Sequence, residues 1–356
     1  MPADASRDEF RNEVLTYWTP RLVADGVDAN DVLNVSGQVS GWSEWTPAWA
    51  KVADHYNDVA QDRLKAGHRV SAGEALVRAS LACHCGQVVA FHDPAEKARL
   101  QARKVALFRE AAPLLRPAAE RIEIPFGDIT LPGYLRLPEG VKGPHACALL
   151  VPGLDSTKED FITVADMCAK RGIASFSFDG PGQGEVRSKA LLAEGYESCI
   201  TAAFAAVAAR PEIDAARIGA LGRSLGGFYV IRAAAVEPRL KTVVVFGGAY
   251  DLTDWPTMPK TIRDGFVYAT GSDNEEQAKQ RMGAATVADA IGKVRCPVLI
   301  VHGARDAIFR RPQAVRLAEG LGKHANLVID EDGVHCCHNH AFEYRTLMAD
   351  WMAKVL

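Results

Sequence analysis

The chain has 356 residues, of which 48% are hydrophobic and 24% charged, and its formal net charge at pH 7 is -3. This length accommodates one large domain or two moderate ones, and the lack of a basic excess excludes nucleic acid as an expected partner. Residues 1–14 are polar and acidic, and no later segment approaches the roughly 18 uninterrupted apolar residues of a membrane span, so we expect a cytoplasmic protein that binds no membrane.

The eight cysteines lie at irregular spacings, which favours reduced thiols over a disulfide framework. Two close pairs, Cys83/Cys85 and Cys336/Cys337, have histidines nearby and leave a metal site as an alternative. Neither pair has zinc-finger spacing. We therefore expect buried thiols, and neither a metal nor a cofactor.

Residues 1–120 have a helical pattern throughout. Ser71-Ala-Gly-Glu74 has the spacing of a capping box, which predicts that a helix begins there. Asp93-Pro94 has the residue types of the N-cap and first position of another helix. We expect that helix to end at the prolines Pro113 and Pro117. We predict a helical cap or lid domain over residues 1–120. A repeat array that binds a protein partner is the alternative, although no fixed period is present.

Four tryptophans, Trp18, Trp42, Trp45 and Trp49, make part of this region unusually aromatic. One interpretation is that they pack the helical domain onto itself or onto a second subunit in a homodimer. The other is that some of them, together with a lid insertion over residues 250–293, roof the active site and shape a pocket for an aromatic group.

Residues 121–356 alternate short apolar runs with helical stretches. Gly127-Asp128 separates the first two runs as in a β-hairpin. The later runs are apolar on both faces, which is typical of strands that helices cover on both sides. We predict an α/β fold with a mostly parallel, doubly wound sheet, in which ligands bind beyond the carboxyl ends of the strands. The later runs are ACALLVPG, GIASFSFDGPG, RIGALGRS, TVVVFGGAYD, PVLIVHGARD and ANLVIDEDGVH.

Ser224 lies in the segment Gly222-Arg-Ser-Leu-Gly226, between the run RIGAL and a helical segment. Flanking glycines let a chain turn sharply from strand to helix while the serine side chain stays exposed. The pattern therefore predicts that Ser224 is a nucleophile. An incidental serine in a glycine-rich turn is the alternative.

A serine hydroxyl needs a base, and the base needs an acid that orients it. In this type of fold the chain order is serine, acid, histidine. Asp306 follows the run PVLIVHG and His335 follows ANLVID, so both lie at predicted strand ends. We predict that Asp306 orients His335, which acts as general base. An Asx-turn, or an ion pair with Arg305 or Arg310, is the alternative role for Asp306.

Three other histidines lie near these positions. His338 and His340 follow His335 closely, and His338 is the main rival base. His302 lies inside an apolar run and is expected to be a hydrogen-bonded core residue. An unperturbed histidine base predicts activity that rises between about pH 6 and 7.5.

Two backbone amides are expected to bind the oxyanion of the tetrahedral intermediate. One belongs to Leu225, directly after the nucleophile, and the other to Leu154 in the turn after ACALLVPG. Ser156-Thr-Lys-Glu159 has the spacing of a capping box that would hold this turn rigidly. We expect Lys158 to be a solvated charge and Asp155 a helix cap, with substrate contact as the alternative.

The segment Asp179-Gly-Pro-Gly-Gln-Gly-Glu185 is a glycine-rich loop after a predicted strand. It lacks both the GxGxxG spacing and the Lys-Ser/Thr pair of phosphate-binding loops. We expect it to form a wall of the active-site mouth and to bind no nucleotide.

Four of these motifs, VPGLDSTKEDF, FDGPGQGE, GRSLGG and DGVHCCHN, together with helical segments such as GHRVSAGEALVRA, carry a family resemblance. The chain resembles the 2,6-dihydroxypseudooxynicotine hydrolase group of α/β-hydrolases over most of its length. The resemblance implies the α/β-hydrolase fold and a triad of Ser224, Asp306 and His335. The enzyme that names the group hydrolyses a carbon-carbon bond next to an aromatic ketone, whereas similar sequences include esterases. Val151-Pro152 stands where relatives often have two glycines.

The expected function is that of a serine hydrolase that cleaves a bond next to the carbonyl of a small aromatic or ketone-containing substrate. Carbon-carbon bond hydrolysis is the leading interpretation, and a carboxylesterase or lactonase with the same triad is the alternative. A non-catalytic helical interaction protein is a further alternative.

Overall fold

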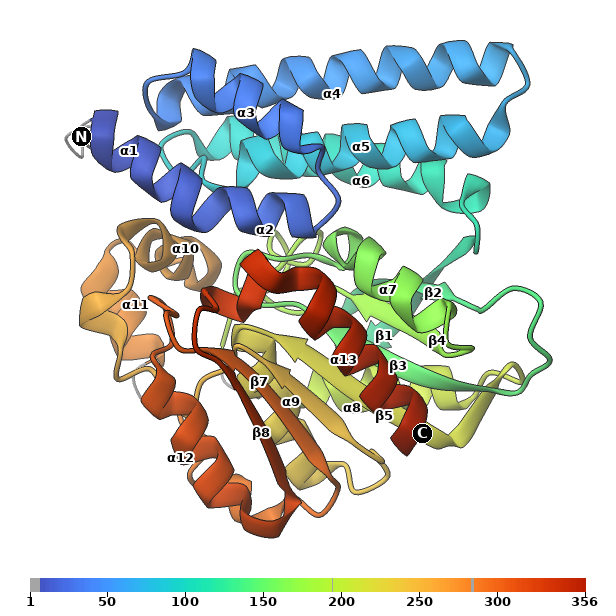
Figure 1. Cartoon of the computed structure of the whole chain (residues 1–356), viewed down its shortest axis with the longest axis vertical. Helices are drawn as coiled ribbons and strands as arrows, with labels where there is room; N and C mark the ends of the chain where they lie inside the picture. Colours follow the sequence, from blue (N-terminus) through green and yellow to red (C-terminus); the bar gives the residue numbers. More distant parts are fainter. Residues whose placement is uncertain (1–6, 194, 283–284) are drawn as a thin grey trace. The chain divides into compact units, whose positions relative to one another are not determined.

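The computed structural model describes residues 7–193, 195–282 and 285–356. It divides into two compact units, Met1–Glu120 and Arg121–Leu356 (Figure 1). Residues 1–6 of the polar N-terminus and residues 283–284 of the expected insertion lie outside the described residues.

The N-terminal unit is helical, as predicted. The prediction for α6 is confirmed, because the Asp93 side chain accepts a hydrogen bond from the Glu96 amide at 3.0 Å and Pro94 is the first helical residue. The helices are α1 (Arg7–Glu13), a π-helix (Val14–Trp18), α2 (Thr19–Ala24), α3 (Ala29–Gln38), α4 (Trp42–Lys65), α5 (Arg69–Val88) and α6 (Pro94–Ala111).

The predicted capping box at Ser71 is wrong. Gly67 has a left-handed φ of 77° in the turn after α4, and the chain re-enters a helix at once. The Ala72 amide already donates to the His68 carbonyl at 3.0 Å, so Ser71 lies inside α5. A turn that glycine favours, rather than a side-chain cap, therefore sets the start of this helix.

The tryptophans of the helical unit contact one another. Trp18, Trp45 and Trp49 are at most 2% exposed. Edge-to-face contacts join Trp42 to Trp45 and Trp45 to Trp49, with ring centroids 5.6 and 5.7 Å apart. The Trp45 indole N–H also donates to the Cys85 carbonyl in α5 at 2.8 Å. These contacts support packing of the helical unit onto itself, whereas the roofing role stays a prediction.

The C-terminal unit holds an eight-stranded sheet in the order β1-β2-β4-β3-β5-β6-β7-β8. The predicted hairpin is present, with Gly127 at a left-handed φ of 55° between β1 and β2. Strand β2 pairs antiparallel with β4, and the pairs from β4 to β8 are parallel. The predicted fold is thus confirmed. The strands are β1 (Ala119–Phe126), β2 (Ile129–Arg136), β3 (His145–Val151), β4 (Ala174–Phe178), β5 (Ile213–Arg223), β6 (Val243–Phe246), β7 (Val298–Gly303) and β8 (Ala325–Asp330).

Helices cover both faces of this sheet. On one face, alternate strand residues such as Leu150 and Val244 pack with Val164 of α7 (Ile162–Ala169) and Met348 of α13 (Ala341–Val355). Helices α8 (Glu197–Ala208) and α9 (Leu225–Val236) lie behind the sheet in Figure 1, opposite α7 and α13. Helix α12 (Arg311–Leu321) connects β7 to β8. Strands β3, β4, β6 and β7 are therefore buried along their whole length, as their continuous apolar runs predicted. The prediction is wrong for β8, an edge strand of which only Asp330 is fully buried.

Extra helices lie between β6 and β7, in the segment predicted as an insertion. They are α10 (Lys260–Thr270) and α11 (Glu275–Met282). Their role as a lid stays a prediction. Among the residues that the structure describes, no helix is both long enough and apolar enough to cross a membrane.

Candidate active site

Ser224 lies on a tight turn between β5 and α9. Its φ and ψ of 57° and -123° are rare for a residue with a side chain, so the backbone is strained there. Two backbone hydrogen bonds hold the turn: the Ser224 amide donates to the Phe246 carbonyl at 2.7 Å, and the Gly227 amide donates to the Ser224 carbonyl at 2.8 Å. The predicted strand-turn-helix setting of Ser224 is present.

The glycines at either side of Ser224 are required by close backbone contacts. A Cβ atom on Gly222 would lie 2.1 Å from the Gly226 carbonyl oxygen, and one on Gly226 would lie 2.3 Å from the Val151 carbonyl oxygen. Both distances are far below van der Waals contact, and backbone atoms cannot give way cheaply. The Gly-x-Ser-x-Gly spacing therefore follows from the turn's own packing.

A chain of hydrogen bonds links Ser224, His335 and Asp306. His335 Nε2 lies 2.9 Å from Ser224 Oγ, and His335 Nδ1 lies 2.7 Å from Asp306 Oδ2. His335 and Asp306 are both buried. The structure thus brings the three predicted residues together from the ends of β5, β7 and β8, with one imidazole nitrogen facing each partner.

The Asp306 carboxylate is held by the backbone as well as by His335. Its Oδ1 accepts from the Ile308 and Phe309 amides at 2.8 and 3.0 Å, while Oδ2 faces His335. The predicted Asx-type turn is therefore present in addition to the contact with the histidine. The ion-pair alternative is wrong for Arg305, whose guanidinium pairs with Asp332 instead.

The Asp306 carboxylate also changes the acidity of His335. Burial lowers the pKa of the imidazole, but the charge of Asp306, followed by the Cys336 side chain, raises it above the ordinary value of 6.5. A base with this raised pKa would lose its proton at higher pH than the unperturbed histidine assumed in the sequence-based prediction.

The rival histidines have other partners. His338 Nδ1 lies 3.3 Å from an Arg345 nitrogen, and His340 Nδ1 lies 2.6 Å from Asp330 Oδ2. His302 is fully buried in β7, as expected, and its Nε2 faces the Phe309 carbonyl at 2.8 Å. Burial lowers the pKa of His302, which favours the neutral ring.

The turn after β3 lies against the nucleophile. A Cβ atom built on Gly153 would lie 3.1 Å from Ser224 Cβ and 3.6 Å from the Leu225 nitrogen. Leu225 is the first residue of α9, and Leu154 follows Gly153. Both predicted oxyanion donors therefore belong to segments that meet beside Ser224.

The predicted capping box at Ser156 and Glu159 is shifted by one residue. Thr157 is the N-cap of a short 3-10 helix (Lys158–Phe161), and its amide donates to Asp160 Oδ2 at 2.9 Å. Ser156 Oγ instead accepts from the Arg223 guanidinium at 2.8 Å. The hydroxyl of Ser156 is thus used to join this loop to the residue before the nucleophile.

The expectation that Lys158 is a solvated charge is also wrong. Lys158 is 1% exposed, and three carboxylates surround its ammonium. Burial lowers the pKa of Lys158, but these carboxylates, Asp179 foremost, raise it above the ordinary lysine value, so the ammonium stays charged. The Nζ atom lies 2.6 Å from Asp179, 2.7 Å from Glu159 and 2.8 Å from Glu185.

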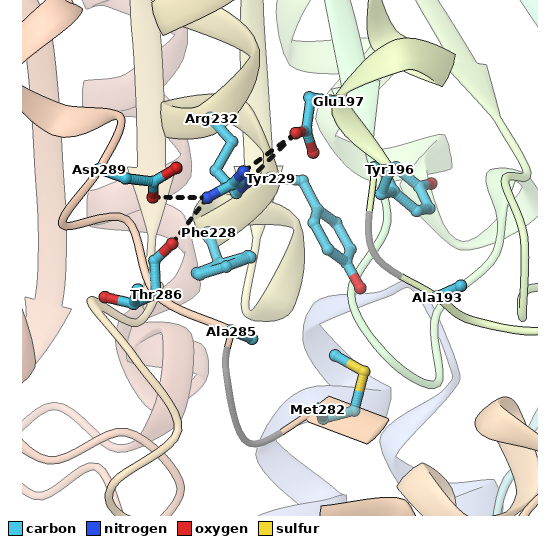
Figure 2. A pocket seen from close by; sticks show the side chains of 11 residues that line it. Ala193, Tyr196, Glu197, Phe228, Tyr229, Arg232, Met282, Ala285, Thr286 and Asp289 are labelled. Carbon is cyan, nitrogen blue, oxygen red and sulfur yellow. Dashed lines mark hydrogen bonds and ion pairs between the residues drawn. The ribbon is translucent and has the colours of Figure 1, made fainter. Parts of the chain in front are cut away.

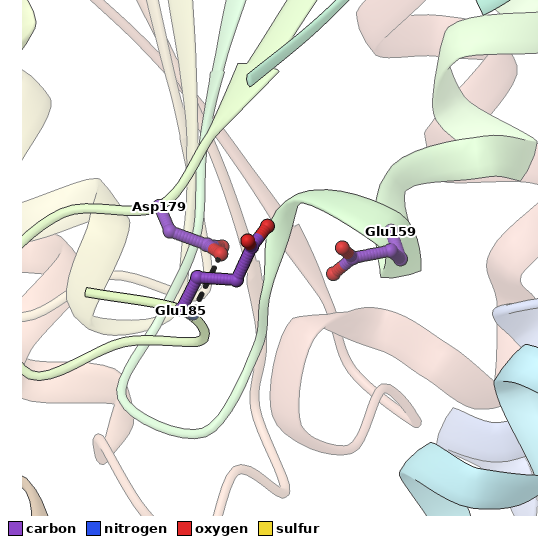
Figure 3. A group of neighbouring side chains, drawn as sticks. All are labelled: Glu159, Asp179 and Glu185. Carbon is purple, nitrogen blue, oxygen red and sulfur yellow. Dashed lines mark hydrogen bonds between the residues drawn. The ribbon is translucent and has the colours of Figure 1, made fainter. Parts of the chain in front are cut away.

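Glu159, Asp179 and Glu185 are close enough to one another to hold a metal ion (Figure 3). The Lys158 ammonium, however, contacts all three, and Arg121 pairs with Glu185 at 2.8 Å. The chain's own cations therefore already pair with these carboxylates and offset most of their charge. The cluster fastens the loop after β3 to the loop after β4, and its members gave no sign of this in the sequence beyond their charge.

A pocket of about 200 Å³ lies beside α9 (Figure 2). Ion pairs of Arg232 with Glu197 and Asp289, at 3.1 and 2.9 Å, cross one side of it. The triad residues are not among the residues that line it. Its lining is Ala193, Gly195, Tyr196, Glu197, Phe228, Tyr229, Arg232, Met282, Ala285, Thr286 and Asp289.

Comparisons with known proteins agree with this architecture. Residues 24–260 match the family described as Esterase FrsA-like, and residues 184–348 match the Dienelactone hydrolase family. The 2,6-dihydropseudooxynicotine hydrolase of Paenarthrobacter nicotinovorans is 37% identical over 94% of this chain and 91% of that protein. The 20-hydroxy-prefusarin hydrolase of Gibberella moniliformis is 29% identical over 88% of this chain and 87% of that protein.

A solved structure shows the same likeness in three dimensions. The crystal structure of the 2,6-dihydroxy-pseudo-oxynicotine hydrolase superposes with a TM-score of 0.88 at 36% identity, over 95% of each chain. The resemblance seen in the sequence motifs is thus confirmed. The chain belongs to the FrsA-like esterase family and to the 2,6-dihydroxypseudooxynicotine hydrolase group of α/β-hydrolases, and it is a hydrolase.

Proposed function

We propose that the chain is a serine hydrolase in which Ser224 is the nucleophile, His335 the general base and Asp306 the residue that orients the base. The observation that carries this proposal is the continuous hydrogen-bonded chain from Ser224 Oγ through both ring nitrogens of His335 to Asp306. The strained turn at Ser224 adds support, because backbone strain clusters at functional sites.

The reaction has two stages. The Ser224 hydroxyl gives its proton to His335 Nε2 while Oγ bonds to the substrate carbonyl carbon, and the Leu154 and Leu225 amides bind the oxyanion. His335 then gives the proton to the leaving group as its bond to the carbonyl carbon breaks. Water, activated by His335, adds to the acyl-enzyme and releases a carboxylic acid and free Ser224.

The leaving atom decides which reaction this is. A carbon leaving group needs its electron pair delocalised into a ketone or a phenol ring, so the substrate of a carbon-carbon hydrolase would be a β-diketone or an acyl-phenol. The close likeness to the 2,6-dihydropseudooxynicotine hydrolase supports this class. An oxygen leaving group needs no such help, and the matches to esterase and dienelactone hydrolase families favour an esterase or lactonase as the second candidate.

Product analysis distinguishes the two candidates. The full chain is incubated with a panel of p-nitrophenyl esters and acyl-phenol ketones, and the products are identified by mass spectrometry. A carboxylic acid together with the parent phenol ring, formed from a ketone, establishes carbon-carbon hydrolysis. Turnover of esters alone supports the second candidate.

We also propose that the helical unit, with the insertion of α10 and α11, covers the site and limits the access of water. Carbon-carbon hydrolysis favours such a cover, because protonation of a carbanion must be controlled.

Ser224→Ala should lower kcat by on the order of 10⁴-fold while the protein stays folded, because substrate binding and the oxyanion donors survive without the nucleophile. Hydrolysis of p-nitrophenyl acetate and labelling by a fluorophosphonate probe measure this. Retention of more than about a tenth of the wild-type rate, or labelling of the variant, would show that another residue is the nucleophile.

His335→Ala should lose as much activity as Ser224→Ala, whereas His338→Ala and His340→Ala should keep most of it. The two control histidines contact Arg345 and Asp330 instead of Ser224. The same ester assay compares the three variants. An inactive, folded His338→Ala variant alongside an active His335→Ala variant would reverse the assignment.

The rate should rise with pH and continue to rise above about pH 7.5. Only the neutral imidazole accepts the Ser224 proton, and Asp306 raises the pKa of His335, so a higher pH is needed to neutralise it. Asp306→Asn should move the rise to lower pH and reduce kcat by about 10⁴-fold. Profiles of kcat/KM against pH test both points, and a wild-type profile that is flat above neutral pH would contradict the first.

Deletion of residues 1–118, which leaves β1 intact, should preserve some activity on a small activated ester and abolish activity on a bulky aromatic ketone. The reason is that a cover matters for a carbanion leaving group more than for p-nitrophenolate. Rates on both substrates are compared for a truncate whose circular dichroism shows a folded sheet. Equal losses on both substrates, or none on either, would assign the helical unit a scaffolding role.

A further inference from the structure

We propose that Gln183 is a positioning residue that orients the Gly153–Leu154 peptide group toward the oxyanion. This inference rests on the proposed serine mechanism and assigns a role to the glycine-rich loop after β4. Gln183 is buried within that loop, and its amide group reaches the turn after β3.

The side-chain amide of Gln183 uses its whole hydrogen-bonding capacity. Its Nε2 donates to the Pro152 and Gly153 carbonyls at 3.0 and 2.6 Å. Its Oε1 accepts from the Gly180 amide and the Tyr196 hydroxyl at 3.0 and 2.5 Å. A flipped amide would face two donors with its NH₂ group and two carbonyls with its oxygen, so only one orientation fits.

The hydrogen bond to the Gly153 carbonyl fixes the orientation of the whole peptide group between Gly153 and Leu154. A trans peptide group is planar, and its N–H points away from its C=O. Holding the Gly153 oxygen on the side of Gln183 therefore aims the Leu154 N–H in the opposite direction. Pro152 has no N–H, so the donors of this turn begin at Gly153. Since Gly153 lies against Ser224, the peptide group that Gln183 holds is next to the reacting atoms.

Tyr196 in turn holds Gln183. Its ring is stacked on Tyr229, with centroids 4.0 Å apart and planes at 10° (Figure 2). The two tyrosines differ in one respect: the Tyr196 hydroxyl donates to Gln183, whereas the buried Tyr229 hydroxyl has no hydrogen-bond partner in the described part of the chain. They form a matched pair for testing what the Tyr196 hydroxyl does.

The test begins with Gln183→Glu, which keeps the side chain's size and its acceptor toward Tyr196 and Gly180 but replaces the NH₂ donor with a second acceptor. Facing two carbonyls, the carboxylate should displace the Gly153–Leu154 peptide. We expect kcat/KM for p-nitrophenyl acetate to fall by about 10- to 100-fold, since a misplaced oxyanion donor costs roughly this much. The rate is expressed per active site, titrated to completion with a fluorophosphonate.

A second measurement separates positioning from a general structural effect. A boronic acid binds Ser224 as a tetrahedral adduct that places an oxygen in the oxyanion site. Its inhibition constant should rise in Gln183→Glu by about the factor by which kcat/KM falls. Loss of folded protein alone would lower the titrated site concentration and leave this constant unchanged.

The tyrosine pair tests the same link without a buried charge. Tyr196→Phe keeps the stacked ring and removes the hydroxyl, and should lower kcat/KM and weaken boronic acid binding about threefold to tenfold, the effect of one hydrogen bond. Tyr229→Phe removes a hydroxyl without a partner and should leave both values unchanged. This pair decides the matter if Gln183→Glu does not fold.

The proposal is overturned if folded Gln183→Glu keeps both values within about twofold of wild type, or if Tyr196→Phe is indistinguishable from Tyr229→Phe. Ser224→Ala, assayed alongside, shows which idea fails. An active Ser224→Ala variant would refute the serine mechanism itself. An inactive Ser224→Ala variant beside a fully active Gln183→Glu variant would refute only the role of Gln183.

Discussion

The close approach of backbone segments at the carboxyl ends of β3, β5, β7 and β8 is the constraint on which the rest of the site depends. A side chain at Gly226 would collide with the Val151 carbonyl, and one at Gly303 would collide with the Gly333 carbonyl. These contacts pack the turn after β5 against the end of β3, and the end of β7 against the turn after β8. Each turn carries one part of the proposed chemistry, so the geometry of Ser224, His335 and Asp306 is set by backbone packing before any side chain is placed.

Much of the fold and the triad could be predicted because their signals are local. A strand that is buried on both faces must be apolar along its length, and a polar residue directly after it must lie at the sheet edge. Ser224, Asp306 and His335 satisfy that rule within a few residues of their strands. The two predicted capping boxes were wrong although Ser71 and Ser156 have the right spacing. The turn at Gly67 starts the first helix before Ser71, and the Ser156 hydroxyl binds the Arg223 guanidinium instead of a helix amide.

The residues that were missed act between segments that are far apart in the chain. Gln183 contacts Gly153 across 30 residues, and Arg223 contacts Ser156 across 67. The sequence shows a glutamine among glycines and an arginine before a serine, but neither pattern says which loop each will meet. Burial of Lys158 was equally hidden, because a lysine is expected to be exposed until three carboxylates are known to surround it.

Two polar networks hold the turn after β3: the charged network of Lys158 and the neutral amide of Gln183. The network of Lys158 holds three carboxylates against the cations of Lys158 and Arg121, an excess of negative charge that would oppose a developing oxyanion nearby. Gln183, which reaches the turn itself, is neutral and presents donors to its carbonyls. Ion pairs thus join the loops after β3 and β4, while a neutral amide holds the peptide group beside Ser224. Because every carbonyl substrate forms the same oxyanion, this arrangement serves carbon-carbon and ester cleavage alike, and the choice between them lies in how the leaving group is received.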